Sequence, residues 1–171
     1  SYSIASTAYK KTLLWKEGIS VIPYPQSVVL HGDDFIFRNM EIIHIDKTAT
    51  DEDLFAANEL SLKMKSRWGI NCKIVTDNTR HGIIFTRSKS AASGNEQGYQ
   101  LESSGGKLII RARNSAGFFY GMQTLLQLIQ NDGKKIFVRG MTISDWPDIP
   151  IRAVHYDTKH FQEKKEYVFN F

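Results

Sequence analysis

Cysteine is nearly absent from this sequence, proline is scarce, and no long apolar run occurs. The one cysteine, Cys72, can form neither an internal disulfide nor a zinc framework of its own, and it does not decide the compartment. No run of apolar residues approaches the roughly 20 needed to cross a bilayer, which predicts no membrane span. The first residues lack the charged-then-apolar layout of a signal peptide, although a mature product whose signal was removed would look the same.

A strong excess of charge of one sign is also missing. The chain has 22 Lys and Arg against 18 Asp and Glu, and its basic residues occur in short scattered groups. A nucleic-acid surface usually concentrates such residues on one element, so we expect no nucleic-acid partner. What the chain does have is 171 residues of ordinary globular composition, 42% hydrophobic and 12% aromatic, which suits one domain or one domain plus a fragment.

Two segments have the pattern of amphipathic helices. The first follows Thr50, a capping residue with Asp53 three positions on, and stops at Gly69; its apolar residues recur at helical spacing. The second spans about residues 115–130, with Asn114 or Ser115 as its cap and a stripe of large apolar residues. The sequence therefore predicts two helices.

The remaining apolar segments are short and of strand length. We expect strands at residues 28–30, 34–37, 41–45, 72–76, 82–86, 99–102, 107–113, 135–138 and 140–143. Gly105 and Gly106 mark a tight hairpin turn, because glycine tolerates positive φ angles. Together these elements predict an α+β fold, in which two helices cover one face of a mainly antiparallel sheet.

Pro147 and Pro150 mark a boundary near the end of the chain. We expect a lead-in segment at residues 1–20, an α+β domain at 21–146, and a further piece at 147–171 that opens with a strand and stops inside a second element. Because terminal elements normally finish their packing, this ending indicates a piece of a longer protein.

That last piece carries the densest group of polar side chains. His155, Asp157 and His160 have the types of zinc ligands but match no familiar ligand spacing, so a hydrogen-bonded structural role is favoured over a metal site. A catalytic triad is disfavoured, since no serine or cysteine lies in a recognisable nucleophile turn. Taken alone, the residues indicate an α+β domain with a polar appendage, no metal and no cofactor.

Three blocks of sequence go further when they are taken in order. They are VIPYPQSV at 21–28; GYQL at 98–101 followed by AGFFYGMQTLLQL at 116–128; and ISDWP at 143–147, which leads into RAVHYDTKHF at 152–161. Their order and spacing resemble family 20 glycoside hydrolases, the β-N-acetylhexosaminidases, from about residue 19 to the end. Lys159 stands where the family more usually has arginine.

The resemblance implies an N-terminal α+β domain followed by a truncated stub of a (β/α)8 barrel. It implies a parent enzyme that removes terminal N-acetylhexosamine residues from glycans with retention, with the acetamido group of the substrate as nucleophile. An adjacent Asp-Glu pair on a later barrel strand assists this reaction in the family. The one Asp-Glu step in this chain, Asp51-Glu52, lies in the small domain, and only 25 residues follow Trp146. A barrel needs about 250.

The resemblance also assigns roles near the barrel mouth. Arg152 matches the family arginine that contacts hydroxyls of the terminal sugar, a task suited to the fixed fork of a guanidinium. Asp157 and His160 match supporting positions. No catalytic residue is expected in this chain, and residues after Pro147 are expected to be poorly anchored without the other barrel strands. The implied partners are the barrel of the same chain and a glycan, in a periplasmic or secreted setting.

A second hypothesis stays open. The chain would then be a free-standing glycan- or protein-binding module with the same fold, using an exposed basic sheet face at Arg111 and Arg113. A stop codon soon after Phe171 in the source gene would favour it over the first hypothesis.

Overall fold

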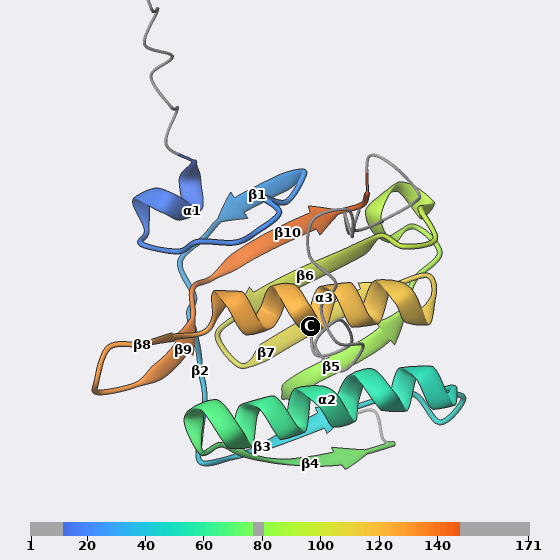
Figure 1. Cartoon of the computed structure of the whole chain (residues 1–171), viewed down its shortest axis with the longest axis horizontal. Coiled ribbons are helices and arrows are strands. Elements are labelled where there is room, and N and C mark those ends of the chain that lie inside the picture. Colours follow the sequence, from blue (N-terminus) through green and yellow to red (C-terminus); the bar gives the residue numbers. More distant parts are fainter. Residues whose placement is uncertain (1–11, 77–80, 148–171) are drawn as a thin grey trace, which may run out of the picture.

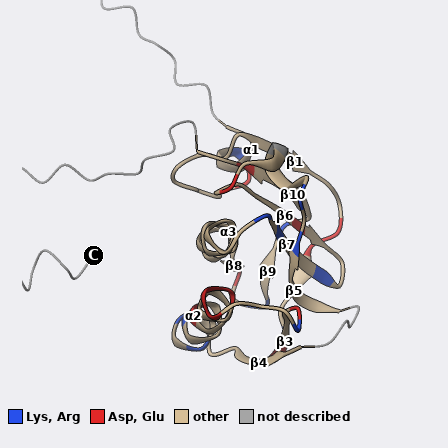
Figure 2. Ribbon diagram, turned by 90° about the vertical axis from the view of Figure 1, so that its right-hand side faces the viewer, with Lys and Arg blue, Asp and Glu red and all other residues tan. Residues whose placement is uncertain are grey.

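The computed structural model describes residues 12–76 and 81–147 (Figure 1). A seven-stranded sheet forms one layer, and helices α2 (Asp51–Trp68) and α3 (Ser115–Leu128) form a second layer on one of its faces (Figure 2). The predicted arrangement of two helices on one face is therefore confirmed. The barrel stub expected at residues 147–171 lies outside the described residues except for Pro147 itself.

The sheet is mixed, which corrects the expected mainly antiparallel pairing. Its order is β1-β10-β6-β7-β5-β3-β4. Pairing is antiparallel from β1 to β7 and parallel from β7 to β4. The strands of this sheet are β1 (Ser27–Leu30), β3 (Met40–His44), β4 (Asn71–Val75), β5 (Gly82–Arg87), β6 (Tyr99–Ser104), β7 (Lys107–Ala112) and β10 (Met141–Asp145). Helix α2 lets β3 and β4 pair in parallel, because it carries the chain back over the sheet between them.

Smaller elements complete the fold. A second sheet has the order β2-β9-β8, with β2 at Phe35–Ile36, β8 at Gln130–Asn131 and β9 at Ile136–Val138. A short helix α1 (Leu13–Lys16) precedes β1, and a 3-10 turn (Ala91–Gly94) precedes β6. Leu14 is fully buried in the main core, so this part of the expected lead-in packs on the domain.

Helix α2 begins and ends as predicted. The Thr50 hydroxyl accepts from the N–H of Asp53, and the Asp53 carboxylate accepts from the N–H of Thr50 at 3.1 Å, which is a complete capping box. Gly69 ends the helix with a φ of +70°, a conformation that glycine adopts without a steric penalty. Helix α3 ends two residues earlier than predicted, because Gln130 and Asn131 pair with β9, and the Asn114 side chain makes no capping bond.

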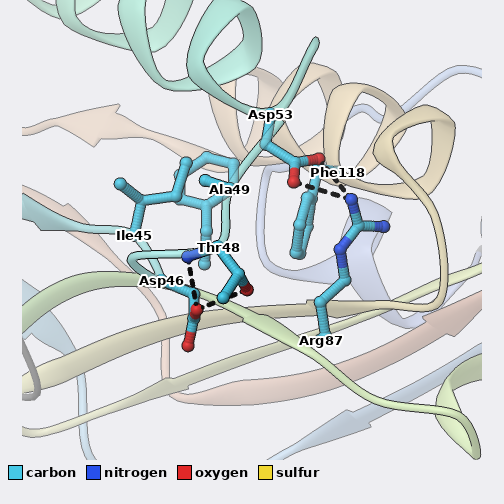
Figure 3. Close-up of a pocket in the computed structure, with 8 residues that line it drawn as sticks. Ile45, Asp46, Thr48, Ala49, Asp53, Arg87 and Phe118 are labelled. Carbon is cyan, nitrogen blue, oxygen red and sulfur yellow. Dashed lines mark hydrogen bonds and ion pairs between the residues drawn. The ribbon is translucent and has the colours of Figure 1, made fainter. Parts of the chain in front are cut away.

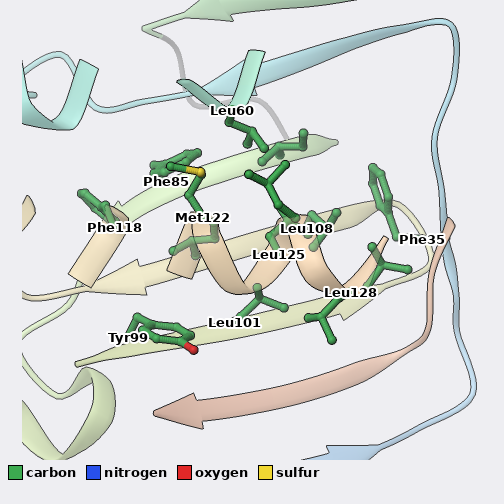
Figure 4. Packing of buried hydrophobic residues seen from close by; sticks show 14 of the residues in the cluster. Phe35, Leu60, Phe85, Tyr99, Leu101, Leu108, Phe118, Met122, Leu125 and Leu128 are labelled. Atoms are coloured by element: carbon green, nitrogen blue, oxygen red, sulfur yellow. The ribbon is translucent and has the colours of Figure 1, made fainter. Parts of the chain in front are cut away.

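The core lies between the helix layer and the sheet (Figure 4). Leu108, Ile110 and Ala112 alternate along β7 and are fully buried, as the hairpin pattern predicts. They pack beneath α3, whose Phe118, Met122 and Leu125 point into the same core. None of the helices among the described residues is long and apolar enough to cross a membrane.

Candidate functional site

The residues to which sequence analysis gave site roles, Arg152, Asp157 and His160, lie outside the described residues, as does the His155 alternative. These assignments stay predictions. Within residues 12–76 and 81–147, no three His, Cys, Asp or Glu side chains gather closely enough to hold a metal ion. The candidate sites for a ligand or a partner in the described residues are therefore polar clusters, hollows and exposed surfaces.

The first cluster lies at the carboxyl ends of β3 and β5, where open parallel sheets commonly bind ligands. Here the Nη2 of Arg87 donates to both carboxylate oxygens of Asp53 at 2.6 Å (Figure 3). It also donates to the Ser115 hydroxyl at 3.1 Å. The guanidinium also lies 4.8 Å from the ring centroid of Phe118. One arginine thus joins the first turns of both helices to the end of β5.

The hollow beside this ion pair is too small for a sugar. It encloses about 10 Å³, hardly the room of one water molecule. Its lining is completed by Ile45, Asp46, Thr48 and Ala49 (Figure 3), and by Phe85. The Thr48 hydroxyl donates to Asp46 at 2.6 Å, and this bond lowers the pKa of the Asp46 carboxyl. The cluster is internally satisfied, so we assign it to the fold rather than to a ligand.

A second hollow of about 90 Å³ lies at the opposite end of the parallel strands. Its acidic lining residues are Asp34 and Glu41. Asp34 lies within 3.7 Å of both Lys135 and Arg139, and Glu41 accepts from the N–H of Arg38 at 2.7 Å. Burial raises the pKa of Glu41, which is only 5% exposed. These carboxylates have partners within the domain, so nothing in this hollow selects a ligand.

A third cluster connects the three sequence blocks quoted above. The Tyr99 hydroxyl lies 2.5 Å from the Thr124 hydroxyl and donates to Asp145 at 3.1 Å, while the other Asp145 oxygen accepts from the N–H of Gln26 at 3.2 Å. Gly117 belongs to the same region, because a methyl group there would run into the carbonyl of Gly98. These residues are far apart in sequence, and their shared role is to fix α3, β6, β10 and the chain before β1 to one another.

The basic face of the second hypothesis is weaker than the sequence suggested. Arg111 does lie on the sheet face away from the helices, but it donates to Glu102 on the neighbouring strand at 2.7 Å. Arg113 is exposed and donates to the carbonyl of Gly94. Glu102 thus offsets the charge of Arg111, so one of the two arginines on which the second hypothesis rests is already paired within the sheet.

Sequence analysis missed one surface, on the outward side of the helix layer. The Phe55 ring stacks on Phe119 of α3 with centroids 6.3 Å apart, and Phe119 meets Tyr120 edge to face at 5.9 Å. Phe55 is 54% exposed, and Leu62, seven residues further along α2, is 62% exposed. We call Phe55, Leu62, Phe119 and Tyr120 the outer helix face. Phe55 and Leu62 are large apolar residues outside the buried stripe of α2, and this offset was the available signal. The apolar residues of that stripe are Ala56, Ala57, Leu60 and Met64.

The fold and the three sequence blocks agree with the known proteins to which this chain is similar. Residues 18–146 match the family model described as glycosyl hydrolase family 20, domain 2. A β-hexosaminidase of Porphyromonas gingivalis is 26% identical, with 86% of this chain matched to 20% of that protein. The chain thus spans about a fifth of the length of this relative.

Solved structures agree. A chitobiase of Flavobacterium johnsoniae superposes with a TM-score of 0.67 at 25% identity, over 86% of this chain and 24% of that one. An N-acetyl-β-hexosaminidase of Streptomyces plicatus superposes with a TM-score of 0.64 at 28% identity, over 75% of this chain and 26% of that one. With the family model covering 18–146, the chain belongs to glycosyl hydrolase family 20, of which it carries domain 2.

Proposed function

We propose that this chain is the non-catalytic N-terminal domain of a β-N-acetylhexosaminidase, which supports the catalytic barrel of the same polypeptide. The observation that carries the proposal is the family match over residues 18–146, in a chain that spans only about a fifth to a quarter of its relatives. The parent enzyme would hydrolyse terminal N-acetylhexosamine residues from glycans with retention, using the acetamido group of the substrate as nucleophile.

The surroundings of Glu52 support a non-catalytic role. It belongs to the single Asp-Glu step of the sequence, yet it lies in the first turn of α2 and is exposed. Hydrogen bonds from its own backbone N–H and from Thr50 lower the pKa of its carboxyl. A general acid in a glycosidase needs the opposite, a pKa raised toward the working pH. Glu52 therefore serves the helix N-terminus, where negative charge is stabilising.

In the parent, Arg152 would bind hydroxyls of the terminal sugar, and Asp157 and His160 would support it at the barrel mouth. These roles rest on the match of the RAVHYDTKHF block to the family pattern, with Lys159 as its one departure. The periplasmic or secreted setting proposed for the parent rests on the same family resemblance. No cofactor enters this scheme.

The test compares the 171-residue chain with the full product of its source gene on a chromogenic N-acetylglucosaminide. We expect turnover only from the full product, and no change in that turnover from Glu52→Gln. Enzyme-like turnover by residues 1–171 alone, lost in Glu52→Gln, would overturn the proposal. So would a source gene that stops shortly after the codon for Phe171.

A further inference from the structure

The sheet face that points away from the helices differs between the antiparallel and the parallel strands. On β1, β6 and β10 the residues of this face are polar apart from Val29. On the parallel strands β3, β4, β5 and β7 the same face carries five large apolar residues, which are Met40, Ile42, Val75, Ile84 and Ile109. The open face is therefore polar on one half of the sheet and apolar along the middle of the other half.

The strand register places three of these apolar residues in one row. Ile109 pairs with Ile84, and Ile84 pairs with His44. His44 also pairs with Val75 of β4, which completes a row across four strands. His44 is only 2% exposed, and its Nε2 lies 2.9 Å from the carbonyl oxygen of His81. An apolar band thus crosses the parallel strands, and it is already shielded from water at its centre.

The strands under this band have the sequence of strands that are covered on both faces. β5 contains the unbroken apolar run 83–85, and β3 contains the run 42–43 beside the buried His44. Parallel strands covered on both faces have such continuous runs, whereas a strand with one face in water alternates, as β6 and β10 do. Both long helices, however, pack on the other face (Figure 2), and Ile42 and Met40 stay 39% and 58% exposed.

The relatives of this chain are long enough to supply a cover for this band. The 156 matched residues are 20% of the P. gingivalis β-hexosaminidase, so that protein has about 780 residues. This chain and a barrel of about 250 residues account for little more than half of that length. The polypeptide that continues past Pro147 leaves from β10, which lies four strands from β3, or about 19 Å at the usual spacing. A part of the parent other than the segment that follows directly is therefore favoured as the cover.

We propose that the open face of β3, β4 and β5 docks a further domain of the parent polypeptide, distinct from the catalytic barrel. This inference rests on the proposed function, since only a longer parent supplies such a partner. The docking surface of the partner would be apolar at its centre, opposite Met40, Ile42 and Ile84, and acidic at its border, opposite Lys73 and Lys107. A covalently linked partner starts from a high effective concentration, so an apolar patch of modest size suffices to hold it.

Cysteine labelling of the full gene product and of residues 1–171 tests the docking face. We would introduce Met40→Cys or Ile42→Cys and follow reaction with a thiol reagent at neutral pH by peptide-resolved mass spectrometry. The matched control is Val29→Cys, at a position that is 57% exposed on the polar half of the same face. The native Cys72 gives a slow background, because burial and the nearby Glu41 carboxylate raise the pKa of its thiol to about 11.

We expect labelling at positions 40 and 42 to be at least tenfold slower in the full product than in residues 1–171, and labelling at position 29 to be equal in the two. Equal rates at 40 and 42 in both proteins would overturn the proposal. Slow labelling at both positions in residues 1–171 would overturn it too, because this chain would then cover the face without a partner.

Cross-linking of the full product identifies what covers the face. Lys73 is exposed and pairs with Ile42, so an amine-reactive reagent can join it to lysines of the docked partner. We expect links from Lys73 to residues that lie outside both this chain and the barrel. Links that lead only to the barrel contradict the proposal, as do links that form only between an isotope-labelled copy and an unlabelled one.

The same preparations separate this inference from the proposed function. If the unmodified full product shows no hexosaminidase activity while positions 40 and 42 are protected, the proposed activity fails and the docking face stands. If it is active while both positions label freely, the docking face fails and the activity stands.

Discussion

Polar side chains on the two sides of the seven-stranded sheet differ in how far they are buried. On the helix-covered side, Asp53 of α2 and Asp145 of β10 are 2% and 7% exposed, and each has hydrogen-bond partners on other elements. On the open face, Glu102 and Arg111 pair across neighbouring strands while both stay in contact with water. Ion pairs that water can reach contribute little, whereas a buried carboxylate that loses its partner is costly.

This difference indicates which contacts fix the arrangement of the helices on the sheet. Buried polar contacts hold only in one arrangement of the helices on the sheet, because each carboxylate on the covered face needs its partner at hydrogen-bonding distance. The open face tolerates many side chains. We therefore expect substitutions to divide sharply by face, with the largest effects at the ends of the helices.

The largest effect is expected for Asp53→Ala. The change removes the partner of Arg87 and half of the capping box, and should lower the free energy of unfolding by about 2–4 kcal/mol; the part of Arg87 that reaches water keeps the loss from being larger. Urea unfolding followed by circular dichroism measures it. Asp51→Ala, in the same turn but exposed, should cost less than about 1 kcal/mol. Equal losses for the two would show that the ion pair is not the cause.

Next comes Tyr99→Phe, which keeps the ring in the core and removes one hydroxyl. Thr124 and Asp145 each lose a partner, so we expect a loss of about 1–2 kcal/mol in the same measurement. Tyr24→Phe, at an exposed tyrosine, is the matched control and should leave stability unchanged. If Tyr99→Phe leaves the free energy of unfolding unchanged, the three sequence blocks are joined by packing alone.

A smaller effect, with a size that depends on pH, is expected for Glu41→Gln. Burial raises the pKa of Glu41, so the folded chain binds this proton more tightly than the unfolded chain. Ionisation therefore costs stability as the pH rises above the ordinary glutamate pKa of about 4.3, and the full cost is present above the raised value. The amide oxygen can still accept from Arg38. Glu41→Gln should raise the melting temperature at pH 7 and change it little at pH 3.5; the reverse order would contradict the desolvation argument.

The smallest effect is expected for Glu102→Gln on the open face. Its bond to Arg111 is short but partly exposed, so removing the charge should change stability by less than about 0.5 kcal/mol, and less still at 1 M salt. Thermal melts at two salt concentrations check this. A loss as large as that of Tyr99→Phe would erase the distinction between the faces.

Local signals in the sequence predicted the local parts of this fold. The cap at Thr50, the stop at Gly69 and the hairpin at Gly105 each depend on neighbouring residues, and each was found where predicted. The reason given for the hairpin was wrong, because neither Gly105 nor Gly106 has a positive φ. The parallel pairing of β5 with β7 and β3 was missed, because nothing local encodes which distant strand a segment joins. The end of α3 was misplaced for the same reason, since β9 competes for Gln130 and Asn131.

The candidate surfaces were less predictable still. The three sequence blocks were recognised as a set, but their physical reason is the Tyr99–Thr124–Asp145 contact, which spans 46 positions and exists only once α3 lies on the sheet. The outer helix face was not predicted, because Phe118, Phe119 and Tyr120 are consecutive in the sequence and nothing local shows which of the three rings faces the core. Phe118 points into the core, while Phe119 and Tyr120 form the contact toward Phe55.

The pairing of β1 with β10 has a consequence for biosynthesis. Leu30 of β1 pairs with Met141 of β10, so β1 leaves the ribosome long before the strand that holds it. At about 5–20 residues per second, β1 waits roughly 5–20 s for that strand. During that interval β6 also lacks its neighbour on one side and presents an unpaired edge. The nascent chain is therefore most exposed to misassembly and to chaperones just before residues 141–145 emerge.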